Sequence, residues 1–288
     1  MSKTTRRIVF FVCAVTWATV FSVFAFEWPA DGGRFRYGFG SYRGGFLRGV
    51  EFGTAEGLIR AADDGELTFA SDGPRLPGGY PIHGGSLLVV SHASDMLTIY
   101  SGMESGSSSV YLKNIRKGDA LGKGGEAGSK RGTGFYAFDA RERRYINPMI
   151  VMPSLSDDKA PVIRSVSLSV DSVDDMLEQG KVVRQGSYYV IIDASDASPV
   201  GLQSAPFELR ILIDGSERGR VRYDAAWANE GQSLLFGGSG IDEDFFLTLD
   251  GRAKFGPYLL SRGRVVLSVI ALDYSGNKRE QSYSISVQ

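Results

Sequence analysis

The side chains that most often carry metal chemistry in enzymes are scarce in this chain of 288 residues. It contains two histidines, His83 and His92, and one cysteine, Cys13. Zinc sites take three or four ligands from Cys, His, Asp or Glu, and catalytic sites rely heavily on neutral imidazole. We expect His92 to be a hydrogen-bonded residue at the end of a strand, and His83 to be exposed in a Gly/Pro-rich loop. The residues therefore favour a protein with no bound metal or cofactor.

No other familiar arrangement of reactive residues replaces a metal site. The sequence has no Gly-x-Ser-x-Gly elbow, no P-loop and no Cys–His pair. Acidic residues gather at Asp193 and Asp196, and again at Asp242, Glu243 and Asp244. Because these residues lack the regular oxygen spacing of a calcium loop, we expect them to cap turns.

The overall charge argues against nucleic acid as a partner. The 32 basic and 33 acidic residues nearly cancel, which leaves a net charge of −1. Phosphate binding is driven by concentrated Lys and Arg, and no long basic run is present. A hydrophobic content of 43% with 37 glycines suits a globular protein rich in turns.

Residues 1–25 are predicted to be an export signal. Basic residues precede an uncharged apolar run from Ile8 to Phe26, and small residues favour cleavage after Ala25. This segment predicts an exported protein of the periplasm or cell envelope. The alternative is an uncleaved anchor, since about 18 apolar residues suffice to span a membrane, and this is the one membrane contact that we expect. Cleavage would remove the cysteine, so the mature chain would form no disulfide.

The elements that must position any site are predicted to be strands. No convincing helical period follows residue 26, and short β-rich runs are separated by Gly, Asp, Asn and Ser clusters, which is typical of an all-β protein. The runs are Leu67–Ala70, Ser86–His92, Leu97–Tyr100, Val162–Val170, Tyr188–Asp193, Phe207–Ile213, Phe245–Leu249, Val265–Leu272 and Ser282–Val287.

The chain is predicted to hold two domains. Residues 154–160 are polar and carry no periodicity, so we interpret them as a linker between a domain at 26–153 and a domain at 161–288. The length agrees, at roughly 150 residues a domain.

The second predicted domain has the pattern of a β-sandwich. Val265–Leu272 is nearly all apolar, as in a central strand, and Ser282–Val287 alternates as in a strand with one wet face. Asp273-Tyr274-Ser275-Gly276-Asn277 supplies a turn between them, and Asp214-Gly215 closes another hairpin. The combination resembles the immunoglobulin-like modules of exported bacterial proteins, which implies a sandwich of about seven strands.

A set of short motifs runs through the first predicted domain in a fixed order and spacing. They are Phe39-Gly40, Phe46–Phe52, Glu56–Leu67, Leu88–His92, Leu97–Met103, Lys117–Gly125, Gly132–Asp139 and Asn147-Pro148. With these motifs the domain resembles the lysostaphin/LytM-type peptidases, family M23, over about residues 37–153. The resemblance implies an antiparallel β-sheet domain, and members of the family use one zinc ion to cut the peptide cross-links of bacterial cell walls.

The positions that carry the family's chemistry have lost it. The resemblance places the zinc ligands at Leu47, Glu51 and Ala137, and the two assisting histidines at Gly102 and Phe135. Of the five residues, only Glu51 offers a ligand atom. Losing an outer partner of a ligand already costs 10–100-fold in metal affinity, so losing two of three ligands should abolish the site. The resemblance therefore implies a degenerate, non-catalytic peptidase domain.

The family's substrate groove suggests what such a domain could still do. We expect the groove face to display Leu47, Glu51, Tyr100, Phe135, Tyr136 and Asp139, with Arg48 and Arg60 nearby. Aromatic and apolar side chains with a few charges can bind an extended peptide or a partner's loop. Alternatively, Leu47, Phe135 and Ala137 fill the vacated space as ordinary core.

The leading hypothesis is a non-catalytic cell-envelope protein that binds an envelope protein or a peptidoglycan peptide, as a scaffold or as a regulator of cell-wall hydrolysis. A second hypothesis is a zinc peptidase with an atypical metal site at Glu51, His92 and Asp139. A third, a surface adhesin or ligand-binding β protein, rests on the sandwich alone, and fold alone does not imply function.

Overall fold

The protein is all-β, as the sequence predicts. The computed structural model describes residues 26–30, 34–43, 45–53, 57–72, 85–106, 113–125, 132–229, 233–236, 241–242 and 247–288. Within these ranges the helical elements are a single turn at Ala93–Asp95 and the short helix α1 (Pro148–Val151). No helix in the described ranges is long and apolar enough to cross a membrane. The predicted export segment and His83 lie outside them.

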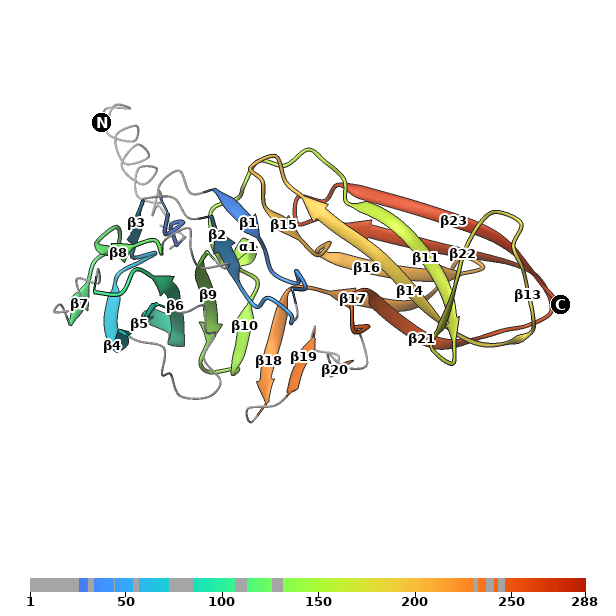
Figure 1. Ribbon diagram of the computed structural model, residues 1–288, viewed down its shortest axis with the longest axis horizontal. Coiled ribbons are helices and arrows are strands. Elements are labelled where there is room, and N and C mark those ends of the chain that lie inside the picture. The colour runs from blue at the N-terminus through green and yellow to red at the C-terminus, as the bar shows by residue number, and fades with distance from the viewer. Residues whose placement is uncertain are drawn as a thin grey trace, which may run out of the picture.

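The N-terminal part of the chain builds an antiparallel sheet around one central strand (Figure 1). Strand β9 (Thr133–Asp139) pairs with β6 (Met96–Met103) along one edge, and with β2 (Val50–Phe52) and β10 (Arg144–Ile146) along the other. The remaining strands are β1 (Phe35–Tyr37), β4 (Gly65–Asp72), β5 (Ser86–Ser91) and β7 (Asn114–Ile115), with a separate pair β3 (Leu58–Arg60) and β8 (Ala120–Lys123).

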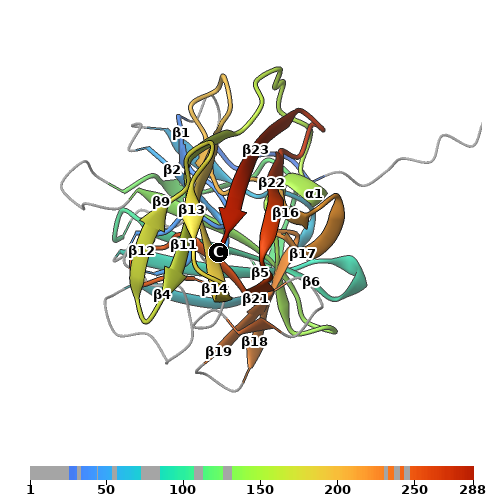
Figure 2. The same cartoon turned by 90° about the vertical axis from the view of Figure 1, so that its right-hand side faces the viewer.

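The C-terminal part forms a β-sandwich (Figures 1 and 2). One layer contains β12 (Val173–Met176), β11 (Val162–Val170), β14 (Gly186–Ala197) and β21 (Ala253–Leu260). The other contains β13 (Val182–Val183), β23 (Lys278–Val287), β22 (Gly263–Leu272), β16 (Glu208–Ile213) and β17 (Ser216–Arg222).

The turns and inward residues of the sandwich follow from the sequence pattern. Alternate residues of β16 and β22, such as Ile211 and Leu267, are fully buried between the layers, where apolar surface leaves water. Asp214 and Gly215 both have positive φ, at 50° and 76°, as a tight hairpin turn requires. The predicted run at 245–249 is different: in its described part, Leu247 forms only an isolated bridge with Ala253.

The two parts are joined by backbone pairing as well as by the chain between them. Strand β15 (Gln203–Ser204) pairs with β1 in parallel and with β14, and β18 (Ala225–Asn229) extends the first sheet by pairing with β10. β19 (Ser233–Phe236) and β20 (Ile241–Asp242) continue from β18. Strands that follow the proposed linker in sequence thus complete the sheet that precedes it.

Two apolar clusters cover the two faces of the first sheet. One holds Val50, Phe52, Tyr100 and Phe135, and its buried residues come from the N-terminal part except for Leu202, which precedes β15. The other includes Tyr136, and it continues without a break into the interior of the sandwich. This shared core is why the face of β9 that carries Tyr136 is not an open surface.

Candidate functional site

The register of β2, β6 and β9 decides which of the candidate site residues lie together. Glu51 of β2 stands opposite Gly134, and Ser101 of β6 stands opposite Gly134 on the other side. Directly paired residues share a face, and side chains alternate along a strand. Glu51 therefore shares its face with Tyr136 and Ser101.

The Glu51 carboxylate is buried and already has a partner. It is 5% exposed, and Arg43 Nη1 lies 3.4 Å from its Oε2. Burial raises the pKa of Tyr136, a hydrogen bond with Ser101 opposes the rise, and the negative charge of Glu51 adds to it. The phenol beside Glu51 is therefore neutral. A Cβ at position 134 would lie 2.9 Å from the Tyr136 hydroxyl oxygen, which explains the glycine there.

Phe135 and Ala137 point to the opposite face. Phe135 pairs with Val50 and Tyr100, and it packs in the cluster that lies mainly in the N-terminal part. Ala137 pairs with Thr98 and is fully buried. The expected single face carrying both Glu51 and these two residues is not found, because Glu51 is offset from them by one residue along β9.

His92 belongs to a chain of buried hydrogen bonds. Its Nδ1 donates to the carbonyl oxygen of Asp64 at 2.7 Å, and its Nε2 lies 2.7 Å from Thr98 Oγ1. Thr98 Oγ1 lies 3.1 Å from the hydroxyl oxygen of Tyr100, which accepts from Ala62 N at 2.8 Å. Burial lowers the pKa of His92, against the hydrogen bond to Asp64, and burial raises the pKa of Tyr100 to about 12. The expectation of a hydrogen-bonded strand-end histidine is met.

Leu47 and Gly102 also fail to provide metal-site geometry. Leu47 packs against the shared core, and its backbone bonds Gly40 and Ser41 within the loop that precedes β2. Gly102 has φ of 72°, a conformation that a histidine would occupy only with strain. At these five positions Glu51 is the single potential donor, and a side chain at 137 points away from it. The residues present do not fit a zinc ion.

Asp139 and Arg48 have local roles. Asp139 Oδ1 accepts from Glu142 N at 2.9 Å, and Arg144 Nε lies 3.5 Å from its Oδ2, so this carboxylate closes the turn after β9. Arg48 lies over the ring of Tyr145, 5.6 Å from its centre. Asp139 lies five residues from Gly134, the residue opposite Glu51, which is about 17 Å along an extended strand. Asp139 and Glu51 therefore cannot bind the same metal ion.

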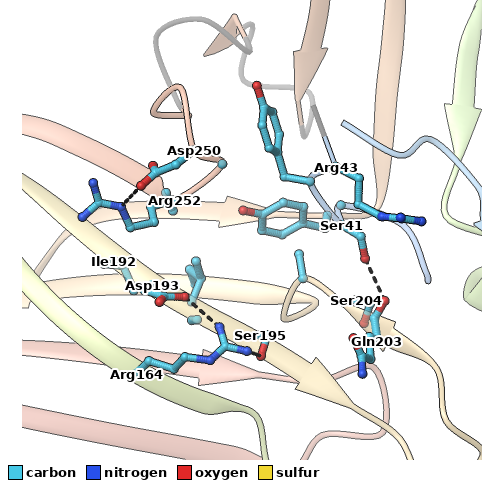
Figure 3. A pocket seen from close by; sticks show the side chains of 18 of the residues that line it. Ser41, Arg43, Arg164, Ile192, Asp193, Ser195, Gln203, Ser204, Asp250 and Arg252 are labelled. Atoms are coloured by element: carbon cyan, nitrogen blue, oxygen red, sulfur yellow. Dashed lines mark hydrogen bonds and ion pairs between the residues drawn. The ribbon is translucent and has the colours of Figure 1, made fainter. Parts of the chain in front are cut away.

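A polar cavity lies where the two parts of the molecule meet (Figure 3). It has a volume of about 310 Å³, at the small end of the range for ligand pockets. Its described lining residues come from β1 and the loop before β2, from β11, β14, β15 and β16, and from Ala205, Tyr223 and residues 250–253, and they include no histidine or cysteine. A wider hollow of about 740 Å³ adjoins it and shares Tyr42, Asp250 and Arg252 as lining.

The polar groups of this cavity are held in fixed positions. Arg164 donates to Asp193 Oδ1 at 2.8 Å and to Ser195 Oγ at 2.6 Å. Ser41 Oγ donates to the carbonyl oxygen of Gln203 at 2.7 Å.

Arg43 connects the cavity to Glu51. Its guanidinium lies 4.3 Å from the ring centre of Tyr37, and it forms the ion pair with Glu51. Arg43, which lines the cavity, thus forms an ion pair with Glu51, which lies behind the lining.

One group of carboxylates was missed by the sequence reading. Asp157, Asp196 and Asp273 place ligand atoms within 4.8 Å of one another, the one such group of three or more potential ligands found in the described ranges. Asp196 is buried within strand β14, and Asp193 pairs with Arg164, so the expectation that these two residues cap turns is wrong. In the sequence, only Asp273 lies in a recognisable motif, the turn Asp273-Tyr274-Ser275-Gly276-Asn277. No pattern indicated that Asp157 and Asp196 would lie beside it.

Comparison with known proteins adds a limited set of likenesses. One protein-family model, which bears no descriptive name, matches residues 160–288. No curated protein matches the chain. Among solved structures, the SpoIIQ–SpoIIIAH pore-forming complex aligns at 15% identity and a TM-score of 0.35, over 44% of this chain and 90% of that one. Lysostaphin aligns at 18% identity and a TM-score of 0.36, over 76% of this chain and 89% of that one.

Proposed function

We propose that this chain is a non-catalytic, exported cell-envelope protein that acts by contact, with a degenerate LytM-like sheet domain joined to an immunoglobulin-like sandwich. The observation that carries the proposal is the burial of the Glu51 carboxylate and its ion pair with Arg43. Glu51 is the one ligand-type side chain at the five positions. A carboxylate committed to a guanidinium in this way serves structure rather than metal binding.

The alternative metal site does not gain support from the geometry. Glu51 lies on the face of Tyr136, whereas His92 bonds Thr98 and Asp64 beside the other cluster, and Asp139 closes a turn at the far end of β9. Three ligands of one ion must lie within a few ångströms of it. The distribution of these three residues over two faces supports the contact hypothesis instead.

The cavity at the junction is the surface that we propose for the partner. The sheet face that carries Glu51 of β2 and Tyr136 of β9 is covered by the chain's own residues, since Phe46 and Tyr223 stack with ring centres 6.3 Å apart within the shared core. The cavity nearby offers fixed charges and hydroxyls, and Leu249 is 99% exposed beside the adjoining hollow. Such a rim suits a polar loop of an envelope protein, or a peptidoglycan peptide, with an apolar anchor.

Site-specific photo-crosslinking tests this proposal in the cells that make the protein. A photoreactive residue at Gln203, an exposed position that lines the cavity, should give a discrete adduct with an envelope protein or with peptidoglycan. The matched control is Arg262, which is exposed at the opposite end of the sandwich, where Leu260 pairs with Gly186. Equal adducts at both positions, or none at Gln203, would contradict the proposal.

A further inference from the structure

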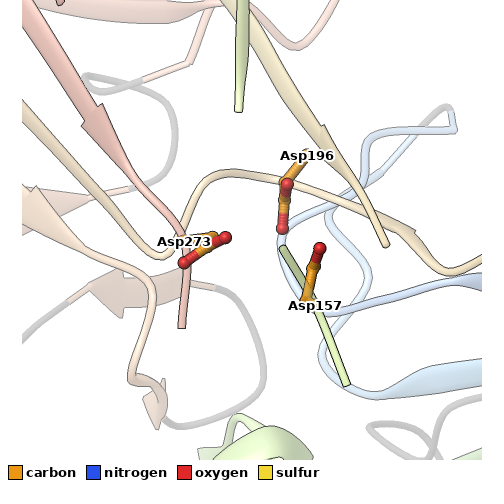
Figure 4. A group of neighbouring side chains, drawn as sticks. All are labelled: Asp157, Asp196 and Asp273. Carbon is orange, nitrogen blue, oxygen red and sulfur yellow. The ribbon is translucent and has the colours of Figure 1, made fainter. Parts of the chain in front are cut away.

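Three aspartates from separate segments converge beside the junction (Figure 4). Asp157 lies in the proposed linker, Asp196 near the end of β14, and Asp273 in the turn between β22 and β23. Their ligand atoms all lie within 4.8 Å of one another. That spacing suits oxygens around one cation, because Ca²⁺–oxygen distances are 2.3–2.6 Å.

Unpartnered buried oxygens point to a missing ligand independently of the acidic cluster. Ser198 lines the same small cavity as Asp157 and Asp196, and its Oγ is buried with no hydrogen-bond partner among the described residues. Asp196 Oδ1 is unpartnered in the same sense, and both residues are 9% exposed. A buried polar atom without a partner costs about 1–3 kcal/mol, so native structures rarely leave one. The cavity volume of about 30 Å³ admits a single ion.

The negative charge of the group is not balanced by ion pairs. Within the described ranges no basic side chain forms a salt bridge with any of the three aspartates. Burial raises the pKa of Asp196 to about 7, and the charges of Asp157 and Asp273 contribute. Burial also raises the pKa of Asp157, and the backbone hydrogen bond from Lys159, with a smaller effect of its charge, opposes this only in part. A cation is the simplest source of compensation.

The carboxylates are already oriented by the chain around them. Asn277 donates from its backbone N to Asp273 Oδ1 at 2.8 Å and from its side chain to Asp273 Oδ2 at 2.7 Å. The same amide donates to the carbonyl oxygen of Asp157 at 3.1 Å, and Lys159 N donates to Asp157 Oδ1 at 3.0 Å. Each of these oxygens keeps a lone pair for an ion. Little reorganisation is therefore needed on binding.

We propose that Asp157, Asp196 and Asp273, with Ser198 as a further oxygen, form a calcium site that fastens the linker to the end of the sandwich. Calcium accepts irregular sets of oxygen ligands, whereas magnesium demands a near-ideal octahedron. Phe39 and Asn147 of the N-terminal part line the same cavity, so the ion would hold the two parts of the molecule at their junction. This site does not depend on the function proposed above.

Calcium titration of the full mature chain tests the site. After treatment with a chelator, isothermal titration calorimetry should show one Ca²⁺ bound with Kd below about 1 mM, as in extracellular calcium modules. The unfolding temperature should rise by roughly 5 °C at a hundredfold excess over Kd. Asp196→Asn should weaken Ca²⁺ binding at least tenfold, and Asp157→Asn, at a less buried position, provides a second variant. Asp158→Asn, an exposed neighbour in the linker, is the matched control and should bind like the unaltered protein.

Two results would overturn the site, and a third would overturn the choice of ion. One is the absence of any Ca²⁺ response in the unaltered protein, which would mean that a shared proton, rather than a metal, relieves the repulsion among the carboxylates. The other is a full Ca²⁺ response in both Asp196→Asn and Asp157→Asn, which would place the ion elsewhere. Tighter binding of Mg²⁺ than of Ca²⁺ would overturn the choice of calcium.

Discussion

Glu51 of β2 pairs with Gly134 of β9, and its side chain therefore lies on the opposite face of the sheet from those of Phe135 and Ala137. Sequence motifs place all three residues at one site, but a strand turns successive side chains to opposite faces. The pairing of Glu51 with Gly134 puts Tyr136 beside the carboxylate instead. The residue types at these positions were readable from the sequence, whereas the face on which each side chain lies required the strand register.

At the same scale, His92 makes the stability of the protein depend on pH. Burial lowers its pKa in the folded state, so the unfolded chain takes up a proton first as the pH falls through about 6.5. The contribution of neutral His92 is complete above that pH and is lost below it. We expect the unfolding temperature to fall between pH 6.5 and pH 5 more steeply in the unaltered protein than in His92→Gln.

Thermal unfolding followed by circular dichroism across this pH range measures the effect. The two proteins should converge as the pH falls, because glutamine carries no titratable proton. Parallel pH profiles for the two proteins would show that His92 is not the group responsible.

At the scale of elements, the loop before β2 joins the two parts of the molecule, and no strand pattern in the sequence indicates this. It carries Phe46, which meets Phe39 edge to face at 5.3 Å between ring centres and stacks on Tyr223 from the C-terminal part. Strands such as Val162–Val170 were predictable because each is a short β-rich run bounded by clusters of turn residues. Contacts between Phe46 and Tyr223 were not, since they join segments far apart in the sequence.

Phe46→Ala should therefore destabilise both parts of the molecule together. Truncating a buried phenylalanine costs about 3–5 kcal/mol, and here the cavity would open in the core that the sheet and the sandwich share. Hydrogen exchange resolved by peptide should show faster exchange in β9 and in β16 alike. Leu249→Ala, at a fully exposed side chain, should change stability by no more than about 0.5 kcal/mol. Faster exchange confined to the N-terminal sheet would contradict a shared core.

At the scale of the whole molecule, strands from the two sides of the predicted linker pair with each other. β1 pairs with β15, and β18 extends the first sheet by pairing with β10. The composition of residues 154–160 indicated a boundary, but composition carries no information about strands that return across it. The all-β class was predictable from the whole chain, and the junction cavity was not, because its lining comes from both sides of that boundary.

The most direct test of the central claim is whether the purified protein, produced without residues 1–25, releases soluble fragments from dye-labelled peptidoglycan in the presence of excess Zn²⁺. A protein that acts by contact should release no more dye than buffer, and Glu51→Ala should leave that result unchanged. Zinc-dependent release well above the buffer rate, abolished by Glu51→Ala, would show that a catalytic metal site survives around this carboxylate.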